Sequence, residues 1–206
     1  MVADPTPAHR LFSDTDNGLL LMISGPSGVG KTTITRAVER SIPGSVFSVS
    51  MTTRPQTPVD VDGVDYHFTT DDEFQRRERA GEFIETAVYA GNRYGTLRAP
   101  VDANLARGRL MILEIDVVGA KNVKRQYPDA LGLFILPPTE DTLLERLRSR
   151  KREAEAVIQR RFAAAKEEIA EARRCGVYDH FIVNDDLQRA INEAVTTVRA
   201  RLARAR

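Results

Sequence analysis

The 206-residue sequence contains a single cysteine, Cys175, and no tryptophan. One cysteine cannot form an intramolecular disulfide, which fits a chain that works in a reducing cytoplasm. The three histidines, His9, His67 and His180, lie far apart in the sequence, and no second cysteine accompanies them. Zinc sites need clustered histidine and cysteine ligands, so we expect no site of that kind.

Neither sign of charge is in excess, because 30 lysines and arginines face 29 acidic residues and the net charge is +1. This balance gives no support for binding nucleic acid through bulk electrostatics. The early apolar run at 19–23 is too short to cross a membrane, and the N-terminus lacks the basic start and apolar stretch of a secretory signal. We therefore expect a cytoplasmic chain with neither nucleic acid nor membrane as a partner.

Apolar runs alternate with helical segments along most of the chain. Residues 19–23 are continuously apolar, as expected of a parallel strand that is buried on both faces. With a length typical of one domain, the alternation predicts an α/β fold with a doubly wound parallel sheet. Residues 1–17, rich in Pro, Asp, Thr and Ser, are predicted to be disordered. The other expected strands are 46–50, 110–116, 131–136 and 181–183, and the expected helices are 31–40, 118–126, a stretch from Thr139 to about 174, and 187–202.

Residues 51–98 have a different texture, with frequent prolines and glycines that predict short strands and turns. One helix is expected there. Thr70 is its predicted N-cap, three acidic residues fill its first turn, and Gly81 ends it. We interpret this stretch as a lobe of mixed α+β structure inserted into the α/β fold.

The strongest local signal is a glycine-rich loop between an expected strand and an expected helix. It matches G-x-x-x-x-G-K-[ST], and this context is the one that a phosphate-binding P-loop requires. The alternative is a glycine-rich turn that contains a lysine by chance. In a P-loop, backbone N–H groups cradle phosphates, Lys31 reaches the β- and γ-phosphates, and the Thr32 hydroxyl ligates Mg²⁺. The predicted ATP-binding residues are Gly25, Pro26, Ser27, Gly28, Val29, Gly30, Lys31, Thr32 and Thr33.

A P-loop alone is compatible with a kinase, a GTPase or an ATPase motor. GTPases usually carry a separate guanine-specificity motif, N-K-x-D, which the segment Asn122-Val123-Lys124 does not match. The chain is also short for a motor. The inserted lobe is therefore the segment that separates these classes.

Seven further segments occur in one order and carry a resemblance that covers about residues 19 to 200. They are SVSMTTR at 48–54, DGVDYHF at 62–68, GEFIE at 81–85, GNRYGT at 91–96, EIDVVGA at 114–120, FILPP at 134–138 and IVNDD at 182–186. Together with the P-loop, they resemble the guanylate kinase family. Members of that family transfer the γ-phosphoryl group of ATP to GMP, giving ADP and GDP.

The resemblance implies one guanylate kinase-like domain over 18–206 with a P-loop NTPase-type fold. It implies Mg²⁺ as the cofactor, ATP and GMP as the substrates, dGMP as an alternative acceptor, and a monomer or a homodimer. Asn184 falls where the family contacts the adenine of ATP. The implied parts are a core at 18–48, 99–139 and 171–206, a GMP-binding lobe at 49–98 and a helical lid at 140–170.

Guanine presents two donors on one edge, N1–H and the N2 amino group, which a single carboxylate can accept together. The resemblance assigns this contact to Glu85 and the hydroxyl groups beside the base to Ser50 and Thr96. A site built for those donors rejects other bases, because its buried groups would be left unpaired. Glu114 and Asp116 are further GMP-binding candidates, and Asp116 also suits a water-mediated contact to Mg²⁺. The alternatives are a solvated Glu85 and a Glu114 that pairs with an arginine.

By the same resemblance, Arg54, Tyr66 and Tyr94 bind the phosphate of GMP. The arginine supplies a charged fork and each tyrosine one hydroxyl group. The alternative for the tyrosines is ordinary packing.

The family pattern T-T-R-x-x-R has a second arginine where this chain has Thr57. The departure predicts one of three outcomes, namely weaker GMP binding, a changed acceptor, or compensation by an arginine such as Arg93 or Arg98.

Arg150 and Arg161 match the lid arginines of the family, which neutralise charge on the triphosphate in the transition state. With Lys31 and Arg54 they complete the predicted catalytic set. The glycine that usually follows the first lid arginine is Lys151 in this chain. This difference predicts a stiffer lid or a hinge elsewhere.

Two other functions stay open at this point. A related P-loop kinase with another acceptor, such as a ribose bisphosphate, would share the fold but would not need Glu85, Ser50 and Thr96. A non-catalytic protein-binding module on the same fold typically loses the P-loop, which is complete here.

Overall fold

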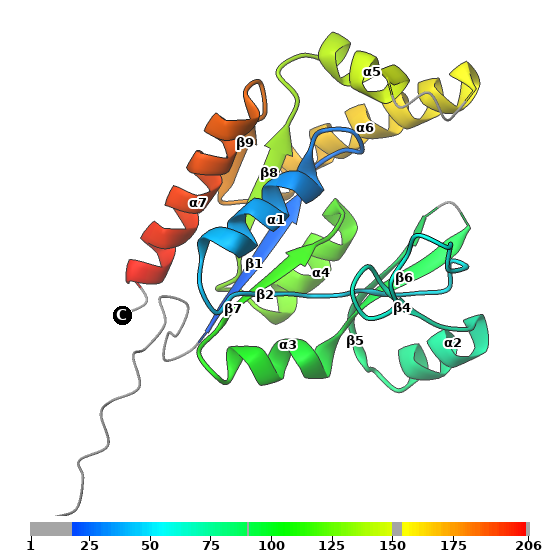
Figure 1. Cartoon of the computed structure of the whole chain (residues 1–206), viewed down its shortest axis with the longest axis vertical. Helices are drawn as coiled ribbons and strands as arrows, with labels where there is room; N and C mark the ends of the chain where they lie inside the picture. Colours follow the sequence, from blue (N-terminus) through cyan, green and yellow to red (C-terminus); the bar gives the residue numbers. More distant parts are fainter. Residues whose placement is uncertain (1–17, 90, 150–153, 205–206) are drawn as a thin grey trace, which may run out of the picture.

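The structure, a computed structural model, describes residues 18–89, 91–149 and 154–204 (Figure 1). The expected disorder of residues 1–17 lies outside the described residues, as do Arg150 and Lys151. Five parallel strands form the central sheet in the order β2-β7-β1-β8-β9. They are β1 (Leu19–Ser24), β2 (Val46–Phe47), β7 (Leu110–Glu114), β8 (Leu131–Leu136) and β9 (His180–Val183).

Helices cover both faces of this sheet, so the predicted α/β fold with a doubly wound parallel sheet is confirmed. Leu21 and Ile23 of β1 pack with two helices on one face, whereas Leu20 and Met22 pack with three helices on the other. Side chains of a strand alternate between faces, which explains why the whole of β1 is apolar. The helices are α1 (Lys31–Ser41) and α7 (Leu187–Arg204) on the first face, and α3 (Arg98–Leu105), α4 (Val117–Gln126) and α6 (Glu155–Cys175) on the second.

A second sheet is built from the proline- and glycine-rich middle of the chain. Its four strands lie in the order β4-β3-β6-β5, with β3 parallel to β4 and the other pairs antiparallel. Its core contains Met51, Phe74 and Phe83, and the rings of Phe74 and Phe83 stack with centroids 4.5 Å apart. The elements are β3 (Met51–Thr52), β4 (His67–Phe68), α2 (Asp71–Arg79), β5 (Phe83–Tyr89) and β6 (Asn92–Leu97).

The predicted helix of this lobe is confirmed as α2. Its N-cap is Thr70, whose side chain accepts a hydrogen bond from the backbone of Glu73. Three acidic residues fill the first turn and three arginines lie near its end, both favourable for the helix dipole. The helix ends with Ala80 as its C-cap, and Gly81 follows in the left-handed conformation, with φ of +69°.

The structure also contains a helix that the sequence reasoning missed. α3 begins at Arg98 and includes Pro100, which lies in the first turn, where a missing N–H costs no hydrogen bond. Two expected strands are shorter than predicted. β2 ends at Phe47, and β7 ends at Glu114 because Asp116 already caps α4.

Helix α5 (Glu140–Ser149) and the first part of α6 share a small core of their own, formed by Leu143, Leu147, Ile158 and Ala165. In Figure 1 they lie at the upper right, and the four-stranded lobe lies at the lower right. Among the described helices, none is both long and apolar enough to cross a membrane.

Candidate active site

The P-loop connects the end of β1 to the start of α1, as the motif requires. Gly25, Gly28 and Gly30 have φ values of +152°, +89° and +93°, a conformation that residues with side chains rarely adopt. Space is tight as well, because a Cβ at Gly25 would lie 2.6 Å from the Ile135 carbonyl oxygen. No side chain caps α1 and no acidic residue lies in its first turn. The N–H groups there are therefore suited to an anion.

The side chain of Asn184 holds the P-loop through a hydrogen bond to its backbone. Its Nδ2 donates to the Val29 carbonyl oxygen at 2.7 Å, and the residue is buried. A Cβ at Gly30 would lie 2.6 Å from the same nitrogen. Arg146 in turn donates to the Asn184 carbonyl oxygen at 2.9 Å. The amide thus fixes the loop, while the predicted adenine contact of Asn184 stays a prediction.

Two cationic side chains lie against the loop. Lys31 Nζ donates to the Gly25 carbonyl oxygen at 2.8 Å, so this side chain folds back along the loop. Arg161 reaches from α6 and donates to the hydroxyl of Ser27. The structure thus brings together Lys31 and Arg161 of the predicted catalytic set. The predicted role of Arg150 lies outside the described residues.

A hydroxyl and a carboxylate meet at the start of α1. Thr32 Oγ1 donates to Glu114 Oε1 at 2.8 Å, and Glu114 Oε2 is buried with no hydrogen-bond partner in the described part of the chain. Hydroxyl and carboxylate oxygens suit Mg²⁺, and an unpaired buried carboxylate oxygen fits a nearby cation. Within residues 18–89, 91–149 and 154–204, no group of three or more His, Cys, Asp or Glu side chains could hold a metal. The described side chains alone therefore do not make a complete metal site.

Asp116 lies just beyond this pair and caps α4. Its Oδ1 accepts a hydrogen bond from the Gly119 N–H at 2.7 Å. Its predicted contacts with GMP and, through water, with Mg²⁺ stay predictions.

The predicted guanine contacts form a buried pair in the lobe. Glu85 on β5 lies opposite Thr96 on β6, and Thr96 Oγ1 donates to Glu85 Oε1 at 2.5 Å. Their residues are only 7% and 1% exposed. Burial raises the pKa of Glu85 to about 7, and the nearby Asp116 adds to this effect. A ligand that donates hydrogen bonds to Glu85 would favour its charged form.

The predicted phosphate-binding residues also come together. Arg54 follows β3, Tyr66 precedes β4 and Tyr94 lies on β6. The rings of Tyr66 and Tyr94 are 5.6 Å apart, and the Arg54 guanidinium carbon lies 5.2 Å from the Tyr66 ring. Ser50, the remaining residue predicted beside the guanine base, directly precedes β3. Its carbonyl oxygen accepts a hydrogen bond from the His67 N–H at 2.9 Å.

Both arginines considered as replacements for the missing one have partners elsewhere in this structure. Arg93 pairs with Asp71 and Glu78 on α2, with N–O distances of 2.9 and 3.6 Å. Arg98 donates to the carbonyl oxygen of Phe83 and to Gln126.

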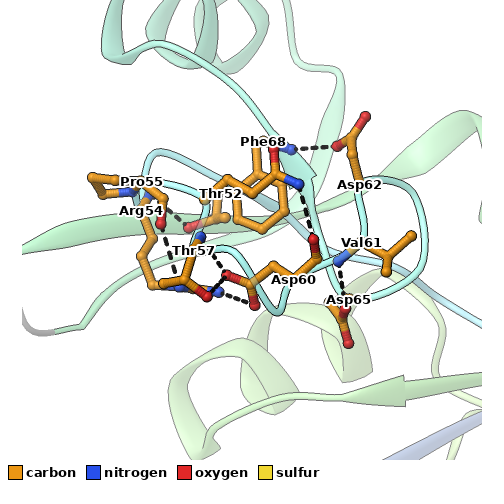
Figure 2. Close-up of polar contacts among 10 residues, drawn as sticks. Thr52, Arg54, Pro55, Thr57, Asp60, Val61, Asp62, Asp65 and Phe68 are labelled. Carbon is orange, nitrogen blue, oxygen red and sulfur yellow. Dashed lines mark hydrogen bonds and ion pairs between the residues drawn. The ribbon is translucent and has the colours of Figure 1, made fainter.

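The partner that Arg54 does have was missed from the sequence. It is Asp60, which also accepts two hydrogen bonds from Thr57 (Figure 2). The only signal was an acidic residue three positions after Thr57, which is not specific.

A parallel sheet with a P-loop after its central strand, and a lobe that presents a buried carboxylate and an arginine–tyrosine cluster, defines a P-loop kinase of the nucleoside monophosphate kinase type. The family model described as guanylate kinase matches residues 17–201. The chain therefore belongs to the guanylate kinase family.

Individual relatives are named as members of the same family. A guanylate kinase from Symbiobacterium thermophilum is 48% identical, over 91% of this chain and 87% of its own length. One from Gloeobacter violaceus is 50% identical, over 85% of this chain and 84% of its own length. The crystal structure of guanylate kinase from Anaplasma phagocytophilum has a TM-score of 0.71 and 28% identity, and the match covers 91% of this chain and 87% of that one.

Proposed function

We propose that this chain transfers the γ-phosphoryl group of ATP to GMP, giving ADP and GDP. The observation that carries the proposal is the buried pair of Glu85 and Thr96 in a chain that also has a complete P-loop. A buried carboxylate that already accepts one hydroxyl has room for the two donors of the guanine edge. Family membership over residues 17–201 supports the same reaction.

ATP would bind at the P-loop. Backbone N–H groups of Gly28, Gly30 and the first turn of α1 would face the phosphates, and Lys31 would leave the Gly25 carbonyl oxygen to reach them. Thr32 and Glu114 would hold Mg²⁺, with Asp116 acting through water. Bound Mg²⁺ neutralises charge on the β- and γ-phosphates.

GMP would bind in the lobe. Glu85 accepts the N1–H and N2 donors of guanine, with Thr96 and Ser50 beside the base. Asp116 and Glu114 would be further contacts to GMP. The phosphate would be bound by Arg54, Tyr66 and Tyr94. A phosphate acceptor is already anionic, so the reaction needs positioning and charge neutralisation more than a general base.

The lid side chains would act on the transferred group. Arg161 exchanges the Ser27 hydroxyl for phosphate oxygens and stabilises the charge of the transition state together with Arg150 and Lys31. Closure of the lid and the lobe over the two nucleotides would exclude water and so protect ATP from hydrolysis. The proposal includes a cytoplasmic location, which the single cysteine favours, and a monomer or homodimer as the active form.

The test is ADP release with ATP and Mg²⁺ while GMP, dGMP, AMP, UMP and ribose 1,5-bisphosphate are offered in turn. We expect turnover with GMP, with or without dGMP. Turnover only with the sugar bisphosphate would contradict the roles of Glu85, Ser50 and Thr96 while keeping the kinase fold. ATP binding without turnover on any acceptor would favour a non-catalytic module.

A further inference from the structure

The guanidinium group of Arg54 already has an anionic partner. Its Nη2 lies 2.9 Å from Asp60 Oδ1, and its Nη1 donates to the Pro55 carbonyl oxygen at 3.3 Å (Figure 2). The side chains of Arg54 and Asp60 are 26% and 13% exposed, so water screens this ion pair only partly. Asp60 is the one carboxylate paired with Arg54 in the described part of the chain.

Asp60 is itself held in a closed turn. Its second oxygen, Oδ2, accepts hydrogen bonds from the backbone N–H and the hydroxyl of Thr57, both at 2.7 Å. The Asp60 N–H donates back to the Thr57 carbonyl oxygen at 3.1 Å. The hydrogen bond from Arg54, together with the two from Thr57, holds the pKa of Asp60 well below its usual range. The carboxylate is therefore charged at physiological pH.

This turn also occupies the side chain that stands in place of the second arginine. A hydroxyl has a single O–H donor, and Thr57 gives its donor to Asp60. Thr57 therefore has no donor left for a ligand. Arg93 and Arg98 are bound elsewhere, as described above.

The charge of the phosphate subsite follows from these contacts. Arg54 contributes one positive charge, Asp60 one negative charge, and the hydroxyls of Tyr66 and Tyr94 none. A phosphate monoester with two negative charges would meet a cluster without net charge. The carboxylate of Asp60 repels the phosphate, whereas the guanidinium of Arg54 attracts it.

We propose that Asp60 sets the affinity of this chain for the acceptor phosphate: held by Thr57, it neutralises Arg54 and keeps the binding of the phosphate weak. The inference rests on the proposed function, because it concerns the phosphate subsite of the acceptor. Asp60 would lower the affinity by offsetting the charge of Arg54, without touching the phosphate itself. It also answers the question raised by Thr57, since the missing arginine is not compensated.

The first test adds a positive charge beside Asp60. Thr57→Arg keeps the backbone N–H bond to Asp60 and gives the subsite a net charge of one. We expect the KM for GMP to fall by about tenfold, as a new charge-assisted hydrogen bond implies, while the KM for ATP stays the same. Thr57→Gln is the matched control, because it has a long side chain without charge and should not lower the KM for GMP. An unchanged KM for GMP in Thr57→Arg would overturn the inference.

The second test removes the negative charge. Asp60→Asn keeps the shape of the side chain, and inorganic phosphate probes the subsite without guanine. With ATP saturating, phosphate should inhibit this variant more strongly and in competition with GMP. Weaker inhibition by phosphate would overturn the inference, because Asp60 would then only orient Arg54.

The inference and the proposed function can fail separately. Binding of inorganic phosphate can also be measured by calorimetry, without turnover. A chain that binds phosphate weakly, and more tightly as Thr57→Arg, but never phosphorylates GMP would contradict the proposed function alone. Turnover of GMP with equal phosphate inhibition in all variants would contradict the inference alone.

Discussion

Thr96 Oγ1 donates a 2.5 Å hydrogen bond to Glu85 Oε1 inside the lobe, where both residues are almost completely buried. The bond connects two antiparallel strands, β5 and β6, at a point where their side chains lie directly opposite. It satisfies only part of the carboxylate. Glu85 therefore keeps acceptor capacity for a ligand but bears the cost of burial when none is bound.

This cost predicts a pH-dependent stability. Burial raises the pKa of Glu85 from 4.5 to about 7, so the folded chain holds a proton that the unfolded chain loses as the pH rises. The stabilising contribution is present below about pH 4.5 and is lost as the pH rises through about 7. Glu85→Gln cannot ionise and should be more stable than the unchanged chain at pH 8 by on the order of 2 kcal/mol.

Thermal unfolding at pH 5 and pH 8 measures this difference. The gap between Glu85→Gln and the unchanged chain should be small at pH 5 and large at pH 8. Glu167→Gln is the control, because Glu167 is exposed on α6. Equal gaps at both pH values would show that Glu85 is charged throughout.

The absence of a side chain at Gly119 leaves room for the carboxylate of Glu85. A Cβ at Gly119 would be 2.9 Å from Glu85 Oε2, the flexible end of a side chain. Gly119→Ala should therefore displace the carboxylate rather than unfold α4, and alanine favours a helix by about 1 kcal/mol over glycine. We expect the KM for GMP to rise by about tenfold through a weakened contact to a charged group, with the KM for ATP unchanged.

The neighbouring Val118 provides a control for that substitution. It lies on the same turn of α4 and is 60% exposed, so Val118→Ala should leave both KM values unchanged. An unaffected KM for GMP in Gly119→Ala would mean that Glu85 does not contact the base in the position seen here.

Much of this fold follows from local patterns. The continuous apolar run before Gly25 and the glycines up to Gly30 predict a strand and a P-loop, because both depend on residues that are adjacent in sequence. Thr70 and Gly81 delimit α2 for the same reason. α3 was not predicted because it contains Pro100, and proline interrupts a helix at every position except those of the first turn.

The side-chain contacts of the site were less accessible. Asn184 supports Val29, which is 155 positions away, and Thr32 meets Glu114, 82 positions away. Nothing local in the sequence distinguishes such a partner from an ordinary polar residue. The resemblance to a family selected these positions, and the structure shows which atoms they contact.

Lys31 should be needed for turnover and not for folding. The side chain of Lys31 is only half-buried, and its one hydrogen bond in the described part of the chain goes to the Gly25 carbonyl oxygen. Lys31→Met should lower kcat by on the order of a hundredfold or more, through loss of charge at the transferred phosphoryl group. Lys121→Met, which removes a lysine paired with Glu171 on the surface, is the matched control for ADP release and melting temperature. Full turnover in Lys31→Met would contradict the assignment of the P-loop.

Asn184 allows its two possible roles to be separated. Asn184→Asp has no N–H donor, so the buried Val29 carbonyl oxygen would lose its partner. An unpaired buried polar group costs about 1–3 kcal/mol. We expect a lower melting temperature and a higher KM for ATP, because the loop that binds the phosphates is loosened.

A comparison of ATP with GTP as the phosphoryl donor separates support of the loop from contact with adenine. If the amide only supports the loop, Asn184→Asp should weaken ATP and GTP as phosphoryl donors by the same factor. A loss for ATP alone would show the predicted contact with adenine. Asn192→Asp is the control, since Asn192 is exposed on α7 and its side-chain oxygen accepts a hydrogen bond from Gln188 at 3.0 Å, which aspartate can also accept. An unchanged melting temperature in Asn184→Asp would mean that the bond to Val29 contributes nothing to the stability of the fold.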